Sequence, residues 1–273
     1  MSGRHLIVNA DDLGLHRGIN AGILKAHRDG IVTSASLSAN GAAFEDAVGL
    51  ARSTPSLEIG VHLTLVGEAP LLPASALPTL APEGRLPGSF AVLFRRLLLG
   101  RIRPDEVARE LKAQVARVRD AGLHVVHLDG HQHVHLHPAL LPIVLEVARG
   151  FAVRAVRAAS RVAPLNGVRP ALLSLVAGAA ARRVRRQGLA SADVLLGAAR
   201  IGRLDEHRLL TLLDTVPHGT SELLCHPGSG SDSIARSYPW GFRWDDEVEA
   251  LTSPRVRAAV AETGIRLISH RDL

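Results

Sequence analysis

The sequence predicts an α/β protein whose strands form a mostly parallel sheet, and three observations support this prediction. Short apolar runs alternate with helix-like segments about seven times, which is typical of repeated strand–helix–strand units. Hydrophobic residues make up 47% of the chain, enough for a sizeable core. The length of 273 residues suits one α/β domain. The spacing alone leaves an open doubly wound sheet and a barrel as alternatives.

Apolar runs bounded by polar residues fit buried strands. The expected strands are 5–10, 31–39, 57–66, 124–131, 151–159, 221–226 and 265–270. The segments expected to form helices are 18–30, 43–53, 104–122 and 138–150. The clearest helix is 104–122, because Pro104 and acidic residues occupy its first turn and Gly122 lies at its end.

Two longer segments interrupt this alternation. Residues 67–103 are rich in Pro, Gly and Leu, with a short helix expected over 89–100. Residues 227–252 carry Gly, Ser, Asp and aromatic residues. Loops of this length in a compact domain are usually functional. Neither segment resembles a linker, so we expect a single domain over residues 1–273.

The composition of the chain indicates which kinds of binding partner and which cellular location to expect. The formal net charge is +6, but the arginines are scattered and not interleaved with aromatic residues, so no nucleic-acid partner is expected. The single cysteine, Cys225, excludes an internal disulfide and is expected in the core. The first residues lack the apolar core of a secretion signal, and the longest apolar run, 170–181, is too short to span a bilayer. We therefore expect a cytoplasmic protein.

A basic segment, 179–187, follows the apolar run 171–178. It could lie on an anionic membrane, and peripheral membrane contact would suit a lipid-linked substrate. A buried helix with a basic end is the commoner explanation and is favoured here. A homodimer is also compatible with the sequence.

Two acidic residues follow directly on the first expected strand, in "NADDLG". Side chains alternate along a strand, so Asp11 and Asp12 are expected to have different roles. Sites in parallel α/β folds gather at the carboxyl ends of the strands. An isolated acidic pair is more often a turn or a helix cap, so these two residues need partners elsewhere to count as a site.

Six of the 14 histidines fall in one stretch that contains "HLDGHQHVHLHP". If residues 127–137 were fully extended they would span roughly 30 Å, too far for one ion to bind all of these histidines. His131 lies just past the expected strand end, where a ligand would be placed. We expect His133 and His135 to orient ligands or contact substrate, and His137 to belong to the start of the next helix.

Three strand ends each supply one candidate metal ligand: Asp12, His62 and His131. By itself, His62 in "IGVHLTL" would more often be a hydrogen-bonded core residue. Together, one carboxylate and two imidazoles leave coordination positions open for water and substrate, which is typical of a catalytic ion. Zn²⁺ suits this ligand set, and Mg²⁺ is the alternative.

A fourth strand end carries His226 in "ELLCHPGSGSD", where Pro227 and Gly228 turn the chain sharply. A histidine so placed could be a general acid, and a strand-end hydrogen bond is the alternative. Arg154 and Arg157 also end or follow a strand. They could bind an anionic group of a substrate, but surface ion pairs are favoured for both.

Four aromatic residues lie within seven positions: Tyr238, Trp240, Phe242 and Trp244. In a chain with only 3% aromatic residues, such a group could form a stacking wall for a sugar ring, with Trp240 as a substrate contact. The alternative is a local cluster that pins the loop.

In this order and spacing, "LIVNADDLG", "GVHLTL", "HLDGHQHVHLHP" and "ELLCHPG" resemble the YdjC-like carbohydrate deacetylases. This family includes chitooligosaccharide deacetylases and hopanoid-biosynthesis-associated deacetylases. The similarity also takes in "VGEAPLLP", "ADVLLG" and "YPWGFRWDDEVEALTSP", so it covers nearly the whole chain. The resemblance implies a distorted (β/α) barrel with one divalent metal ion. Leu13 stands where the family usually has Phe, a tolerable apolar exchange.

Position by position, the resemblance implies that Asp12, His62 and His131 bind the metal ion. Asp11 would be the catalytic base, and His226 would be the acid or a substrate contact. The implied reaction is hydrolysis of the N-acetyl group of an amino sugar, either an oligosaccharide or a lipid-linked glycoside, with release of acetate.

The chemistry agrees with this implication, because a metal ion polarises an amide carbonyl and lowers the pKa of a bound water. Two alternatives remain. A phosphoesterase on the same scaffold would need a second metal ion and more acidic ligands than this chain supplies. A non-catalytic metal- or sugar-binding protein would have no need of Asp11.

Overall fold

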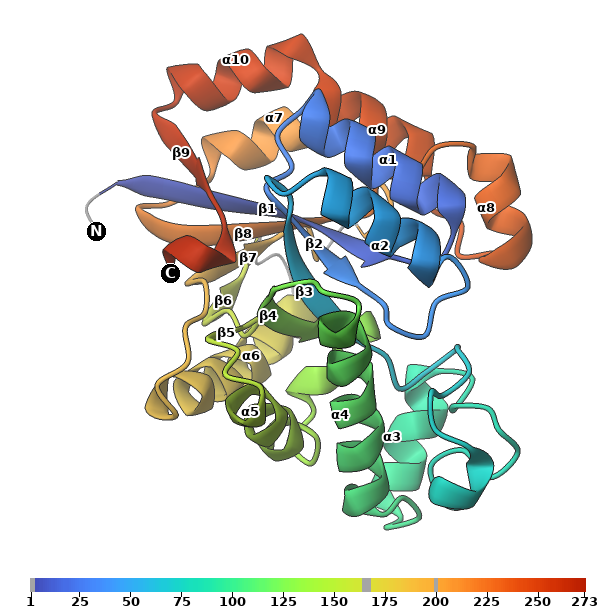
Figure 1. Cartoon of the computed structure of the whole chain (residues 1–273). Coiled ribbons are helices and arrows are strands. Elements are labelled where there is room, and N and C mark those ends of the chain that lie inside the picture. The colour runs from blue at the N-terminus through green and yellow to red at the C-terminus, as the bar shows by residue number, and fades with distance from the viewer. Residues whose placement is uncertain (1–2, 164–167, 199–200) are drawn as a thin grey trace.

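In the part of the chain that the structure describes, nine parallel strands form one curved sheet with helices on its outer side (Figure 1). The structure is a computed structural model that describes residues 3–163, 168–198 and 201–273, the side chains of 168–176 excepted. The strands are β1 (Arg4–Leu13), β2 (Ser34–Leu37), β3 (Glu58–Leu63), β4 (Val125–Gly130), β5 (Ala155–Val156), β6 (Arg161–Val162), β7 (Val194–Leu196), β8 (Gly219–Cys225) and β9 (Ile265–Ile268).

The sheet has β1 at its centre and runs in the order β5-β4-β3-β2-β1-β8-β7-β6. On one edge of β1, β9 pairs with residues 4–7 and β2 pairs from Asn9 onward. An isolated parallel bridge joins Ala155 on β5 to Ala190, just before β7. The bridge brings one end of the sheet close to the other. The predicted distorted barrel of mostly parallel strands is therefore confirmed.

Helices connect most of the successive strands and cover the sheet (Figure 1). The α-helices are α1 (Arg17–Arg28), α2 (Phe44–Ser53), α3 (Phe90–Leu98), α4 (Pro104–Asp120), α5 (Leu141–Gly150), α6 (Val168–Arg186), α7 (Glu206–Asp214), α8 (Ser231–Ser237), α9 (Trp244–Thr252) and α10 (Pro254–Glu262). Short 3₁₀ helices are η1 (Ala74–Ala76), η2 (His131–Leu136) and η4 (His270–Asp272). Helix α1 packs on α2 and β1, and α4 packs on α5, β3 and β4.

The long segment before α4 is held by two buried carboxylates of that helix. Glu106 accepts backbone N–H groups from residues 79–80, and Glu110 accepts them from residues 71–72, at 2.7–3.1 Å. Both glutamates are fully buried, so these hydrogen bonds satisfy carboxylates that would otherwise be costly to bury. These hydrogen bonds hold the segment that leads into α3 in place beside the barrel.

All seven expected strands are present, but the sequence analysis did not predict β6 and β7. These strands have two and three residues, too short to give a periodic signal. The expected loop over 227–252 is wrong in part, because α8 and α9 lie there. Helix α9 begins with three consecutive acidic residues in its first turn, which complement the helix dipole and could have revealed it.

The predicted helix with a basic end is confirmed for the described part of α6. Ala181 and Val184 are buried, whereas Arg182, Arg183 and Arg186 are exposed. Within the described residues, no helix is long and apolar enough to cross a bilayer.

Candidate metal and catalytic site

One pocket of about 290 Å³ at the carboxyl ends of the strands collects every predicted site residue. These residues are Asp11, Asp12, His62, His131, His133, His226 and Trp240. Their positions in sequence lie far apart, and the parallel strands bring them together. The structure therefore brings the predicted site residues together, and their individual roles remain predictions.

The two acidic residues reach the same pocket because β1 is irregular at its end. The register between β1 and β2 shifts between Ala10 and Leu13. Asp12 has a positive φ of 70°, a left-handed conformation that Asp tolerates better than most residues. A bulge of this kind re-aims a side chain that would otherwise point to the opposite face from its neighbour.

The three candidate ligands form a compact group. Asp12 Oδ1 lies 3.4 Å from His62 Nε2 and 3.0 Å from His131 Nδ1. One ligand atom from each residue lies within 4.8 Å of the other two. Asp12 and His62 are buried, and the His131 side chain is only 12% exposed. One carboxylate oxygen and two imidazole nitrogens at this spacing fit a divalent ion with open coordination positions.

Asp129, which the sequence analysis did not single out, orients one of these ligands. His62 Nδ1 donates to Asp129 Oδ1 at 2.8 Å, which leaves Nε2 to face Asp12. A carboxylate on the far nitrogen fixes the ring and makes the near nitrogen a better metal donor. A second group, Asp11, His62 and Asp129, also has ligand atoms within 4.8 Å. Both of its carboxylates already accept from Arg157, so it suits an ion less well.

We expect Asp129→Asn to weaken divalent metal binding by about 10- to 100-fold, since an amide polarises the His62 ring less than a carboxylate. Calorimetric titration of the metal-free protein with Zn²⁺ measures this. Glu222→Gln is the matched control, because Glu222 is another buried carboxylate bound to Arg157 at 2.7 Å. Equal Zn²⁺ affinity in Asp129→Asn and wild type would contradict the orienting role.

A buried ion-pair network lies directly beneath the pocket. Arg157 Nη1 and Nη2 donate to the two carboxylate oxygens of Asp11, each at 2.7 Å. Arg157 also pairs with Asp129 at 2.8 Å and with Glu222 at 2.7 Å. Burial opposes the charge, but the three carboxylates raise the pKa of Arg157 well above its usual value. The arginine therefore fixes both oxygens of Asp11 in one orientation.

The prediction that Arg157 forms a surface ion pair is wrong, because its side chain is fully buried. Strand β5 ends at Val156, so Arg157 points into the barrel while Arg154 is exposed. Sequence periodicity could not show this, because a two-residue strand does not define which side faces inward. Asp129 left a weak signal, since it alternates with His127 along β4.

The histidines after β4 lie in three different environments, and His135 does not line the pocket. Gln132 and His133 both have left-handed φ values, 52° and 55°, so the chain turns tightly instead of extending. His133 lines the pocket, and burial lowers its pKa to about 3, which keeps the ring neutral. His135 Nε2 donates to the Arg157 carbonyl at 2.8 Å. His137 Nδ1 accepts from Ala139 N at 3.2 Å, next to the start of α5.

His226 and the aromatic residues close the opposite side of the pocket. The His226 backbone N–H donates to buried Glu247 at 2.6 Å, and its ring lies 5.1 Å from that of Phe242. Among the described residues, its Nδ1 has no hydrogen-bond partner. Trp240 lies 5.3 Å from His131, ring centre to ring centre. Trp244 is buried in the core, so it cannot belong to the expected stacking wall.

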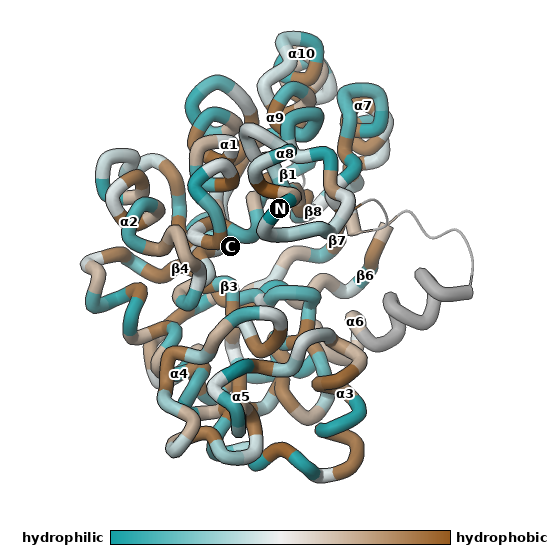
Figure 2. Tube along the Cα trace, turned by 90° about the vertical axis from the view of Figure 1, so that its right-hand side faces the viewer, coloured by the Kyte–Doolittle hydropathy of each residue, from teal (hydrophilic) through white to brown (hydrophobic). Residues whose placement is uncertain are grey.

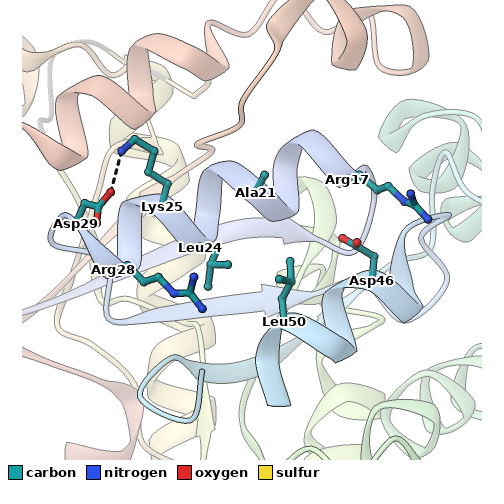
Figure 3. A pocket seen from close by; sticks show the side chains of 8 residues that line it. All are labelled: Arg17, Ala21, Leu24, Lys25, Arg28, Asp29, Asp46 and Leu50. Atoms are coloured by element: carbon teal, nitrogen blue, oxygen red, sulfur yellow. Dashed lines mark hydrogen bonds and ion pairs between the residues drawn. The ribbon is translucent and has the colours of Figure 1, made fainter. Parts of the chain in front are cut away.

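Another cavity, of about 610 Å³, lies between α1 and α2 (Figure 3). Lys25 pairs there with Asp29 at 2.8 Å, and both side chains are more than half exposed. Its lining contains no histidine and no buried carboxylate. It therefore lacks the buried carboxylate and imidazole groups that the catalytic pocket brings together.

The fold is a parallel α/β barrel whose pocket contains one carboxylate and two imidazoles that could hold a metal ion, and known proteins resemble this chain. A family model described as YdjC-like protein matches residues 5–262. The chain is 35% identical to a carbohydrate deacetylase of Geobacillus stearothermophilus, over 98% of both chains. It is 37% identical to a chitooligosaccharide deacetylase of Klebsiella pneumoniae strain 342, over 99% of both.

A solved structure from Enterococcus faecalis V583, provisionally described as a cellobiose-phosphate cleavage protein, is also similar. It has a TM-score of 0.83 and 30% identity over 99% of both chains. The chain belongs to the YdjC-like family.

Proposed function

We propose that this protein is a metal-dependent deacetylase that hydrolyses the N-acetyl group of an N-acetylated amino sugar and releases acetate. The observation that carries the proposal is the arrangement of Asp12, His62 and His131 in one pocket with Asp11 and His226. The names of the two bacterial relatives support the same reaction class.

In this proposal one divalent ion, Zn²⁺ or Mg²⁺, is held by Asp12, His62 and His131. When bound, it polarises the amide carbonyl and lowers the pKa of a water molecule. Zn²⁺ suits the two imidazoles better than Mg²⁺, which prefers oxygen ligands.

Asp11 is the proposed base that takes the proton of the attacking water. Its Oδ1 accepts from Arg157 and from Asn9 Nδ2, whereas its Oδ2 accepts from Arg157 alone and keeps a lone pair for that proton. The arginine holds Asp11 in one position, which favours a reaction that depends on orientation.

His226 is the proposed acid that protonates the sugar nitrogen as it leaves. The His226 side chain belongs to the lining of the pocket, where the leaving nitrogen would lie. Trp240, beside His131, provides a face on which a sugar ring can stack, and His133 can accept or donate one hydrogen bond to a sugar hydroxyl. The single domain over 1–273, the cytoplasmic location and the homodimer remain predictions.

Acetate release from a panel of N-acetylglucosamine compounds tests the reaction. The panel contains the free sugar, N,N′-diacetylchitobiose and a lipid-linked glycoside, each assayed with chelator and after Zn²⁺ or Mg²⁺ is restored. We expect chelator to abolish release from at least one compound and the ion to restore it.

A cellobiose phosphate serves as the control for the phosphoesterase alternative, in view of how the Enterococcus protein is described. Phosphate release from it, with no acetate from any member of the panel, would contradict the proposed function. A binding protein would release neither product.

A further inference from the structure

A chain of uncharged polar side chains lies in the barrel interior, next to the catalytic pocket but outside its lining. Asn9 on β1 and Ser36 on β2 are both fully buried, and neither lines the pocket. The strands β1 and β3, which flank β2, lie between α1 and α10 on one side and α4 and α5 on the other (Figure 2). Burying such polar groups is costly unless they are hydrogen-bonded, so their partners indicate what they do.

Asn9 holds the proposed base. Its Nδ2 donates one hydrogen to Asp11 Oδ1 at 2.8 Å and the other to Ser36 Oγ at 2.7 Å. Its Oδ1 accepts from Ser34 Oγ at 2.7 Å. An ionised carboxylate can only accept, so the amide must turn its nitrogen toward Asp11. Both amide hydrogens are therefore used, and the orientation of the Asn9 side chain is fixed.

Ser36 continues the chain to a second carboxylate. Its Oγ donates to Asp129 Oδ2 at 2.7 Å, and His127 Nε2 lies 3.1 Å from the same oxygen. The single hydroxyl hydrogen is taken by Asp129, so Nε2 of the ring must donate to Ser36. Burial lowers the pKa of His127 well below its usual value, which keeps the ring neutral with its hydrogen on Nε2. Each hydrogen bond of Ser36 thus has one possible direction.

The barrel is built to bring the His127 ring against Ser36. Gly60 on β3 pairs with Ser36, and a Cβ at Gly60 would lie only 2.2 Å from Cε1 of His127. Any larger residue would displace the ring. The other neighbour of the ring is His270, which stacks on it with 3.7 Å between ring centres. Ser36 therefore has little freedom to move.

Together, Asn9 and Ser36 link the proposed base Asp11 to Asp129, the carboxylate that orients a candidate metal ligand. Arg157 also joins these two carboxylates, because its Nη1 lies 2.7 Å from Asp11 Oδ2 and 2.8 Å from Asp129 Oδ2. One shared nitrogen would let the two groups turn relative to each other. The second link, through the other oxygen of Asp11, opposes that rotation.

We propose that Asn9 and Ser36 are positioning residues that hold Asp11 at a fixed place relative to the metal ligand His62. This inference rests on the proposed deacetylase function. Neither residue would touch the substrate or the ion. A base that takes the proton of a water beside the ion must stay within hydrogen-bond reach of it, so a small displacement slows the reaction.

The variant Asn9→Ala tests the proposal, because it removes the hydrogen bonds to Asp11 and Ser36. We expect kcat for acetate release to fall at least about tenfold, with KM changed by less than about twofold. Calorimetric titration of the metal-free variant should give a Zn²⁺ affinity within about threefold of wild type, since Asp129 keeps its bond to His62.

Gln114→Ala is the matched control. Gln114 is another fully buried amide that donates to a carboxylate, Glu110 at 2.9 Å, and it does not line the pocket. It should retain wild-type kcat. Urea unfolding shows whether each variant is folded. Asn9→Ser, whose side chain is too short to reach Asp11 and Ser36 together, replaces Asn9→Ala if the latter does not fold, and the same loss of kcat is expected.

A double-mutant cycle separates positioning of the base from a general structural role. If Asn9 acts through Asp11, adding Asn9→Ala to Asp11→Asn should lower kcat further by less than about twofold. A general defect would lower kcat equally with and without Asp11.

Three outcomes would overturn the inference and leave the proposed function intact. These are wild-type kcat in the folded Asn9 variant, an equal loss of kcat in both backgrounds of the cycle, and a loss of Zn²⁺ affinity that accompanies the loss of rate. The last would make Asn9 a support of the ion site instead of the base. Acetate release from no substrate by wild type would contradict the proposed function, and the inference with it.

Discussion

Replacing Asp11 by Asn is expected to lower kcat for deacetylation by about 1,000-fold while the protein keeps its metal ion. A general base typically contributes between about 100- and 10,000-fold to the rate, and asparagine cannot take the proton of water. Asp11 lies outside the group of three candidate ligands, because both of its carboxylate oxygens accept hydrogen bonds from Arg157. Acetate release and the metal content of the purified variant measure the two effects separately.

Asp232→Asn is the matched control for this substitution, because Asp232 is exposed on α8, away from the pocket lining. It should retain wild-type kcat. Activity in Asp11→Asn close to that of wild type would remove Asp11 from the mechanism. Loss of the metal ion together with the activity would instead make Asp11 a ligand.

Replacing Arg157 by Met is expected to lower the free energy of unfolding by about 3–5 kcal/mol, the typical cost of removing one partner of a buried ion pair. The substitution leaves Asp11, Asp129 and Glu222 buried without their shared cation. Urea denaturation monitored by circular dichroism measures the change. Arg154→Met is the control, since this arginine is exposed and should shift the free energy by no more than about 0.5 kcal/mol.

The effect of Arg157→Met should depend on pH in a defined direction. Arg157 contributes to holding the pKa values of Asp129 and Glu222 below their usual values of about 4. In wild type this stabilisation is present above that pH and is lost as the pH falls through the lowered pKa values. Without the arginine, the buried carboxylates ionise at a cost. The difference in stability between variant and wild type should therefore shrink as the pH falls below about 4, and a difference independent of pH would contradict this explanation.

The sequence predicted the candidate site better than the details of the fold. Parallel strands end at one edge of the sheet, so polar residues at the ends of separate apolar runs could be grouped without knowing how the helices pack. Asp12, His62 and His131 were found in this way. The spacing within one strand, by contrast, predicted opposite faces for Asp11 and Asp12, and only the bulge in β1 explains why both reach the pocket.

There is a physical reason why the residues that support the site could not be predicted from the sequence. Arg157 follows a two-residue strand, and its three carboxylate partners come from β1, β4 and β8. Contacts between segments more than 60 residues apart leave no periodic signal in one sequence. A mainly apolar cavity of about 570 Å³, lined in part by Phe90, His133 and Leu195, was not predicted either, because α3, the η2 loop and the strands that line it come together only in the folded barrel.

The central claim is that one ion held by Asp12, His62 and His131 is required for deacetylation. The most direct test is to titrate the metal-free protein with Zn²⁺ and to follow acetate release from its best substrate. The account predicts a linear rise in rate that stops at one ion per chain, and no rise in a His62→Ala variant. A rate that needs a second ion, or full activity in the metal-free protein, would contradict it.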